Sequence, residues 1–120
     1  MQDLKLGAVE TRFAEIVWEN APLSSGELVR LCQEELNWKK PTTYTVLRKL
    51  CDKGIFQNRD GAVTVLITRE EFYSLQSCQF VEETFHGSLP AFLAAFVGKR
   101  KLTPGELQEL QTLIDSQRRE

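Results

Sequence analysis

The chain has 120 residues, with 15 basic and 17 acidic side chains and a formal net charge of −2. A chain of this length suits one domain, or one small domain plus an appendage, and it can bury a core without disulfides or metals. No apolar run approaches the ~20 residues of a membrane-spanning helix, and the first ten residues lack a signal-peptide pattern, so we expect a cytoplasmic protein without membrane insertion.

Positive charge is concentrated in one part of the chain. Residues 1–38 hold three basic and seven acidic side chains, a net charge of −4, and residues 61–120 hold six basic and eight acidic ones, a net charge of −2. Residues 39–60 hold six basic and two acidic side chains, a net charge of +4. A focused basic block in an acidic chain favours a small footprint on DNA over indiscriminate coating of it.

Two helices are predicted before the basic block. Residues 6–20 carry apolar side chains at helical spacing, and Pro22 ends this helix because proline disfavours helical geometry in the residue before it. Ser24 and Glu27 then fit a capping box, in which each side chain bonds the other's backbone amide. The second helix runs to about Trp38, which we expect to pack in the core. Its inward-facing side chains are Leu28, Leu31, Cys32 and Leu36.

The stretch from Lys39 to Ile55 predicts a short, sharply bounded third helix. Pro41 suits the first helical position, and Gly54 suits a left-handed residue just past the end. At about 100° per residue, one side holds Thr43, Val46, Leu47 and Leu50, and the other holds Thr45, Arg48 and Asp52, flanked by Tyr44 and Lys49. The first side can anchor the helix in a core, and the second offers hydroxyls and cations that suit the DNA major groove. An ordinary amphipathic helix with a solvated charged face is the alternative.

After Gly54 the apolar pattern changes to the alternation typical of strands. Residues 55–59 and 62–67 flank Asp60-Gly61, which predicts a β-hairpin because a type I′ turn requires positive φ at both central residues. Arg59 at the hairpin tip would lie beside the third helix and contact phosphate or the minor groove, or else be a solvated turn residue. A helix-turn-helix followed by a hairpin predicts a winged-helix DNA-binding domain over residues 1–68.

Residues 69–120 are too one-sidedly apolar to form a core of their own. Three helical segments are predicted, over residues 69–86, over residues 89–97 and after a capping box at residues 103–106. We expect a helical dimerisation region, because two-fold dimers are the commonest homo-oligomers, while packing back onto the first domain is the alternative. The apolar side chains that need a partner surface are Phe85, Leu89, Phe92, Leu93, Phe96, Leu107, Leu110, Leu113 and Ile114. The predicted fold class is mostly α with a small β-hairpin.

Other chemistries have little support in the sequence. Cys32, Cys51 and Cys78 are widely separated and His86 is the only histidine, so we expect three reduced thiols that are packed or half-packed, no metal site and no cofactor, with a redox role of Cys51 as the alternative. No catalytic triad or glycine-rich phosphate loop is visible, so we predict that the protein is not an enzyme.

Three motifs follow one another in a specific order. They are E-x-x-F-A-E-I-V-W from Glu10 to Trp18, W-K-K-P-T-T-Y-T-V-L-R-K-L-x-x-K-G-I from Trp38 to Ile55, and F-x-G-S-L-P-A-F-L-A-A-F from Phe85 to Phe96. With them, nearly the whole chain resembles the BlaI/MecI/CopY family of bacterial repressors, the penicillinase-repressor type. The resemblance implies a winged helix that reads a palindromic operator, typically with TACA/TGTA half-sites, and C-terminal helices that interlock into a homodimer.

The resemblance also implies which residues face DNA. These are Thr42, Tyr44, Thr45, Arg48 and Lys49 on the recognition helix and Arg59 on the wing. Copper-responsive members end in a cysteine hook that this chain lacks, so we expect no copper sensing. Repressors of the β-lactam branch are cut at an Asn-Phe bond, where this chain has Ala95-Phe96. The inducing signal, and whether a membrane sensor-protease acts upstream, therefore stay open.

The leading prediction is a dimeric, sequence-specific transcriptional repressor that binds a double-stranded DNA operator. Phosphate contacts would come from Lys39, Lys40, Thr42, Lys53 and Arg59, and base edges would be faced by Tyr44, Thr45, Arg48 and Lys49. The alternative is a winged-helix protein–protein interaction module whose basic face docks an acidic partner. The hydroxyl cluster at residues 42–45 favours DNA, whereas weak salt dependence of DNA binding would favour the module.

Overall fold

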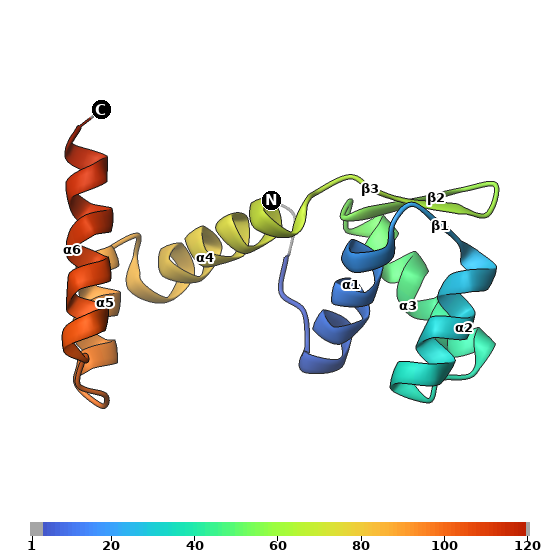
Figure 1. Ribbon diagram of the computed structural model, residues 1–120, viewed down its shortest axis with the longest axis horizontal. Helices are drawn as coiled ribbons and strands as arrows, with labels where there is room; N and C mark the ends of the chain where they lie inside the picture. The colour runs from blue at the N-terminus through green and yellow to red at the C-terminus, as the bar shows by residue number, and fades with distance from the viewer. Residues whose placement is uncertain (1–3, 120) are drawn as a thin grey trace. The chain divides into compact units, whose positions relative to one another are not determined.

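The computed structural model describes residues 4–119 of the chain. Figure 1 shows its elements, which in chain order are α1 (Ala8–Asn20), β1 (Leu23–Ser24), α2 (Ser25–Leu36), α3 (Lys40–Asp52), β2 (Phe56–Arg59), β3 (Ala62–Val65), α4 (Arg69–Phe85), α5 (Leu89–Val97) and α6 (Pro104–Arg118). The chain divides into two compact units between Gln79 and Phe80, inside α4. We call them unit 1 and unit 2. The domain boundary predicted after residue 68 lies just before α4, whereas the first turns of α4 belong to unit 1.

The first helix begins two residues later than predicted, at Ala8 instead of Leu6. The reason is a cap that the sequence reasoning did not use. Gly7 lies before the helix in extended backbone, and its N–H donates to Glu10 Oε1 at 3.0 Å. Glu10 also places its negative charge in the first turn, where the helix dipole favours it.

The second helix ends two residues before the predicted Trp38. Its start is as predicted, because Ser24 Oγ accepts the Glu27 amide at 3.1 Å. The end moves to Leu36 because Asn37 adopts the left-handed conformation, with φ of 56°. Trp38 follows this break and stacks on Phe13 with ring centroids 5.7 Å apart, so its predicted core packing is confirmed.

The strands form an antiparallel three-stranded sheet of order β1-β3-β2. β2 pairs with β3 from Phe56 opposite Val65 to Arg59 opposite Ala62, and the predicted two-residue turn joins them with φ of 53° at Asp60 and 82° at Gly61. β1 was not predicted. It pairs Leu23 with Val63 and ties the segment before α2 to the hairpin.

A single core holds unit 1 together. It is formed by α1, α2, α3, the sheet and the first turns of α4, and its fully buried larger side chains are Phe13, Val17, Leu28, Cys32, Thr43, Leu47, Leu50, Ile55, Phe56, Val63 and Phe72. Trp18 lies at its edge, where Nε1 donates to the Ile67 carbonyl at 3.0 Å. Three helices followed by a hairpin form a winged helix, so the predicted fold class is confirmed.

Unit 2 contains the end of α4 together with α5 and α6. α5 starts at Leu89 with Ser88 Oγ accepting the Ala91 amide at 3.1 Å, and α6 starts at Pro104 with the predicted Thr103–Glu106 capping box. Neither α5 nor α6 contains a buried residue. None of the helices in residues 4–119 has the length and apolar character that crossing a bilayer demands.

Candidate nucleic-acid interface

Helix α3 is bounded on both sides by local signals. Lys39 in extended backbone precedes it and Pro41 lies in its first turn, where the missing N–H costs no hydrogen bond. At its end the Ile55 N–H donates to the Leu50 carbonyl at 3.1 Å and the Gly54 N–H donates to the Cys51 carbonyl at 2.9 Å. Gly54 has φ of 80°, so this is a Schellman ending. The predicted bounds hold to within a residue.

The two faces of α3 differ as the periodicity predicts. Thr43, Leu47 and Leu50 are at most 2 % exposed and fix the helix in the core. On the opposite face Thr42, Thr45, Arg48 and Lys49 are exposed. Thr45 Oγ1 donates to the Pro41 carbonyl at 2.9 Å, and the Thr45 side chain is exposed. A groove ligand can therefore reach this face without unfolding the helix.

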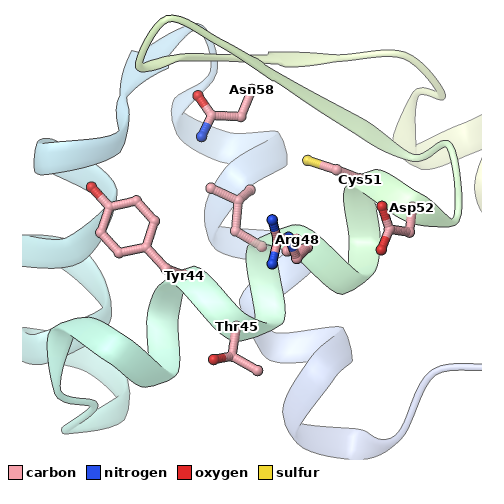
Figure 2. A pocket seen from close by; sticks show the side chains of 7 residues that line it. Tyr44, Thr45, Arg48, Cys51, Asp52 and Asn58 are labelled. Atoms are coloured by element: carbon pink, nitrogen blue, oxygen red, sulfur yellow. The ribbon is translucent and has the colours of Figure 1, made fainter.

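A depression of about 610 Å³ lies between α3 and the hairpin. Its lining residues are Tyr44, Thr45, Leu47, Arg48, Cys51, Asp52 and Asn58. Figure 2 shows Asn58 extending from the hairpin toward α3, with Arg48 between Tyr44 and Cys51 along the helix. Asn58 was missed by the sequence reasoning. The signal that could have found it is the two-residue period of a strand, which places Asn58 on the same side of β2 as the buried Phe56.

Tyr44 is held by a residue that was also missed. Its hydroxyl donates to Ser25 Oγ at 3.1 Å, and the side chain is half-buried against the core. The Ser25 N–H in turn donates to the Gly61 carbonyl at 2.8 Å. Ser25 at the start of α2 therefore connects the exposed face of α3 to the hairpin turn and fixes their relative position.

Lys49, one of the predicted DNA contacts, forms an ion pair with a residue of α1. Its Nζ lies 2.8 Å from Glu10 Oε2, which links α3 to α1. The hydrogen bond from Lys49 and the one from the Gly7 N–H hold the pKa of Glu10 below its ordinary value. Among residues 4–119, no such pair engages Lys39, Lys40, Arg48 or Arg59. Lys53 is half-buried and its charge also contributes to the lowered pKa of Glu10.

The remaining predicted cations lie at the two ends of the interface. Lys39 and Lys40 are exposed at the start of α3. Arg59 is exposed in the last ladder pair before the hairpin turn, opposite Ala62. Positive charge therefore flanks the depression, an arrangement that can position a phosphate backbone around a central reading surface.

The cysteines differ in accessibility. Burial raises the thiol pKa of Cys32 and of Cys51, so both thiols are protonated at neutral pH and poorly reactive. Cys78 is exposed on α4, contrary to the expectation that all three would be packed or half-packed. Within the part of the chain that the structure describes, no cluster of His, Cys, Asp or Glu is arranged to hold a metal ion.

Unit 2 presents an apolar surface. Of the nine predicted dimerisation residues, Leu89, Phe96, Leu107, Leu113 and Ile114 are between 40 and 58 % exposed. Phe85, Phe92, Leu93 and Leu110 are half-buried. Phe85, Phe92 and Phe80 pack edge to face, with centroids 5.6 to 6.0 Å apart, and a groove of about 520 Å³ runs between α5 and α6. We call these nine residues the apolar surface of unit 2.

Comparison with known proteins gives consistent matches over nearly the whole chain. A family model described as penicillinase repressor matches residues 6–116. The chain is similar to the penicillinase repressor of Bacillus licheniformis, with 20 % identity covering 92 % of this chain and 90 % of that protein. It is also similar to the methicillin resistance regulatory protein MecI of Staphylococcus aureus strain Mu50, with 22 % identity, and of Mammaliicoccus sciuri, with 21 % identity, each covering 92 % of this chain and 94 % of the relative.

Proposed function

The chain belongs to the penicillinase repressor family, whose members are transcriptional regulators and not enzymes, and we propose that it represses transcription as a homodimer on a palindromic operator. The prediction that it is not an enzyme is confirmed by this membership, and binding of DNA by a repressor follows from it. The dimer, the two-fold operator and the residues that contact DNA are our proposal.

One observation carries the proposal. The recognition helix α3 buries one face in the core and leaves Thr45 and Arg48 exposed beside the Tyr44 ring, with cations at both ends of the interface. Arg48 would read a base edge, since a guanidinium matches the two acceptors of guanine, and the Thr45 methyl group suits contact with thymine. Phosphate contacts from Lys39, Lys40, Thr42, Lys53 and Arg59 would set the register.

The apolar surface of unit 2 supports the proposed homodimer. Five of its nine proposed dimerisation side chains are exposed and four are half-buried, and contiguous exposed apolar patches mark interaction sites. Two copies joined there would present two recognition helices to two half-sites related by a two-fold axis. Release of the operator would then come from any signal that separates or cuts unit 2.

Proteolysis is one such signal, and the structure of α5 bears on it. The Ala95-Phe96 bond lies inside α5, in regular helix. Proteases preferentially cut exposed loops, so cleavage here would require local unwinding of α5. Cleavage by a membrane sensor-protease would therefore act only on a chain in which α5 has first opened.

Binding to a designed duplex tests the proposed function. The probe carries TACA and TGTA as an inverted repeat, in versions with different central spacings, and a scrambled duplex of the same composition is the control. We expect a preference of at least about 10³-fold for one spacing over the scrambled duplex. We also expect affinity to fall steeply with salt, because phosphate contacts release counterions. Equal and salt-insensitive binding to all duplexes would contradict the proposal and favour a module that docks an acidic protein.

A further inference from the structure

The first turns of α4 are fastened to α1 by a polar cluster. Arg69 Nη2 lies 2.6 Å from Glu15 Oε2, and the Tyr73 hydroxyl donates to Glu15 Oε1 at 2.8 Å. Both oxygens of one carboxylate on α1 are thus engaged by α4. The hydrogen bond to Glu15 raises the pKa of Tyr73, so the phenol stays a donor at neutral pH. We call Glu15, Arg69 and Tyr73 the α1–α4 clamp.

Apolar and backbone contacts extend the attachment along the same face of α4. Phe72 is 1 % exposed, and its ring centroid lies 5.3 Å from that of Trp18. Further along, Gln76 Nε2 donates to the Leu4 carbonyl at 3.4 Å, and the Leu4 N–H donates to Gln79 Oε1 at 3.3 Å. At about 100° per residue, positions 69, 72, 73, 76 and 79 fall on one side of the helix. All of these contacts lie in unit 1.

The same helix is the covalent connection between the two units. It continues without interruption from Arg69 to Phe85, and its residues from Phe80 onward belong to unit 2. We propose that Glu15 is a positioning residue, whose clamp on Arg69 and Tyr73 fixes how α4 leaves the winged helix and so selects the spacing between operator half-sites. The inference rests on the proposed function, since half-site spacing has meaning only for a dimer on two-fold DNA.

The physical reason is the stiffness of the connection. Inserting one base pair between half-sites moves them apart by about 3.4 Å and rotates one by about 35° around the DNA axis. A clamped α4 resists that displacement. A loosened α4 acts as a flexible linker, so the effective concentration of the second winged helix at its half-site changes little with the distance between the half-sites. None of the three clamp residues belongs to α3 or the hairpin, so recognition of one half-site is left unchanged.

The experiment uses the whole 120-residue chain and the two-fold duplex that the wild-type chain enriches from a random-sequence pool. The centre of that duplex is lengthened and shortened in single base-pair steps. We expect the affinity of the wild-type chain to fall about tenfold or more when the spacing changes by one base pair. The affinity of the Glu15→Ala variant should fall less than about threefold, and its affinity for a single half-site should equal that of the wild type. Amides of residues 69–75 should also exchange with solvent faster in Glu15→Ala, while those of α3 keep the wild-type rate.

Two controls separate the clamp from general destabilisation. Glu34→Ala removes the exposed Arg30–Glu34 ion pair on α2, outside the clamp, and should keep the wild-type spacing curve. Arg69→Lys retains a cation beside Glu15, and since Arg69 Nε is buried with no hydrogen-bond partner among the described residues, the change loses no bond at that atom. This variant should also keep the wild-type curve.

The outcomes distinguish the two proposals. A wild-type chain that enriches no two-fold duplex contradicts the proposed function and removes the spacing role with it. A wild-type chain that does enrich one, while Glu15→Ala keeps the steep spacing curve, overturns the clamp alone. Equal flattening by Glu34→Ala also overturns it, because the effect would then not be specific to α4.

Discussion

Arg48 and Lys49 are neighbours in α3 but have different surroundings. Arg48 lines the depression, and no ion pair holds it within residues 4–119. Lys49 is paired with Glu10 at 2.8 Å. Arg48 can approach a base edge without breaking an ion pair, whereas Lys49 must leave the Glu10 carboxylate before it can contact DNA. The two adjacent cations are therefore expected to contribute unequally.

Arg48→Ala should cost ~1–3 kcal/mol of binding free energy and relax the preference at one position of each half-site. Titrations of a duplex panel with single-position changes measure this. Arg30→Ala is the matched control, because Arg30 lies on α2 in an exposed ion pair with Glu34, and it should bind like the wild type. Uniform weakening across the panel would mean that Arg48 contacts only phosphate.

The Glu10–Lys49 pair predicts a pH dependence of stability. The pKa of Glu10 is lower in the folded chain than its ordinary value of 4.5. Such a carboxylate stabilises the fold above its unfolded pKa, and this contribution is lost as pH falls through the folded pKa. Because Lys49 is 58 % exposed, solvent screens the pair, and Glu10→Gln should lower the free energy of unfolding by less than about 1 kcal/mol at pH 7.

Urea unfolding of wild type and Glu10→Gln at a series of pH values tests this. The difference between the two proteins should be largest near neutral pH and shrink as pH falls below about 4.5. A difference that is the same at pH 7 and pH 3 would show that the Gly7 and Lys49 contacts to Glu10 do not depend on its charge.

Among the single elements, helix α3 has an end that its local sequence defines through Gly54. Gly54 has φ of 80°, a conformation that a Cβ disfavours. Gly54→Ala should therefore cost about 1–2 kcal/mol in the free energy of unfolding, measured with urea. Gly26→Ala is the control, because Gly26 lies in helix α2 and its added Cβ would meet the Ser24 hydroxyl oxygen at an ordinary 3.8 Å. Equal stability of the two variants would contradict the proposed strain at Gly54.

Local signals allowed most element boundaries to be predicted. Serine and threonine caps start α2 and α6, Pro41 and Gly54 bound α3, and Asp60-Gly61 makes the hairpin turn, since each acts within a few residues. What the sequence could not reveal depends on residues far apart in the chain. β1 forms because Leu23 pairs with Val63, and the sequence of a two-residue segment does not indicate which distant strand it pairs with.

The same limit applies to the candidate site. The exposed face of α3 follows from its own period, so Thr45 and Arg48 could be predicted. Ser25, Asn58 and Glu10 come from other elements and act on α3 only once the chain is folded. In α4, Gln76 and Gln79 lie on the side that packs on unit 1 for a reason visible only in three dimensions, because they bond the backbone of Leu4.

For the whole molecule, the apolar surface of unit 2 predicts the oligomeric state. Leu113 is 58 % exposed on α6 and lines the groove between α5 and α6. Leu113→Asp would place a charge in the proposed dimer interface and should raise the dimer dissociation constant at least about tenfold, measured by sedimentation. Val9→Asp is the control, because Val9 is 51 % exposed on α1, outside unit 2, and it should leave the dimer intact. An unchanged dissociation constant for Leu113→Asp would place the dimer contact elsewhere.

The central claim is that two copies of this chain read two-fold DNA through α3. Selection of random-sequence duplexes by the purified 120-residue chain, at fixed near-physiological salt, tests it most directly. We predict enrichment of a site with two-fold symmetry. The Arg48→Ala variant should lose the base preference at one position of each half-site. A folded protein that enriches no motif, or only a single asymmetric one, would contradict the claim.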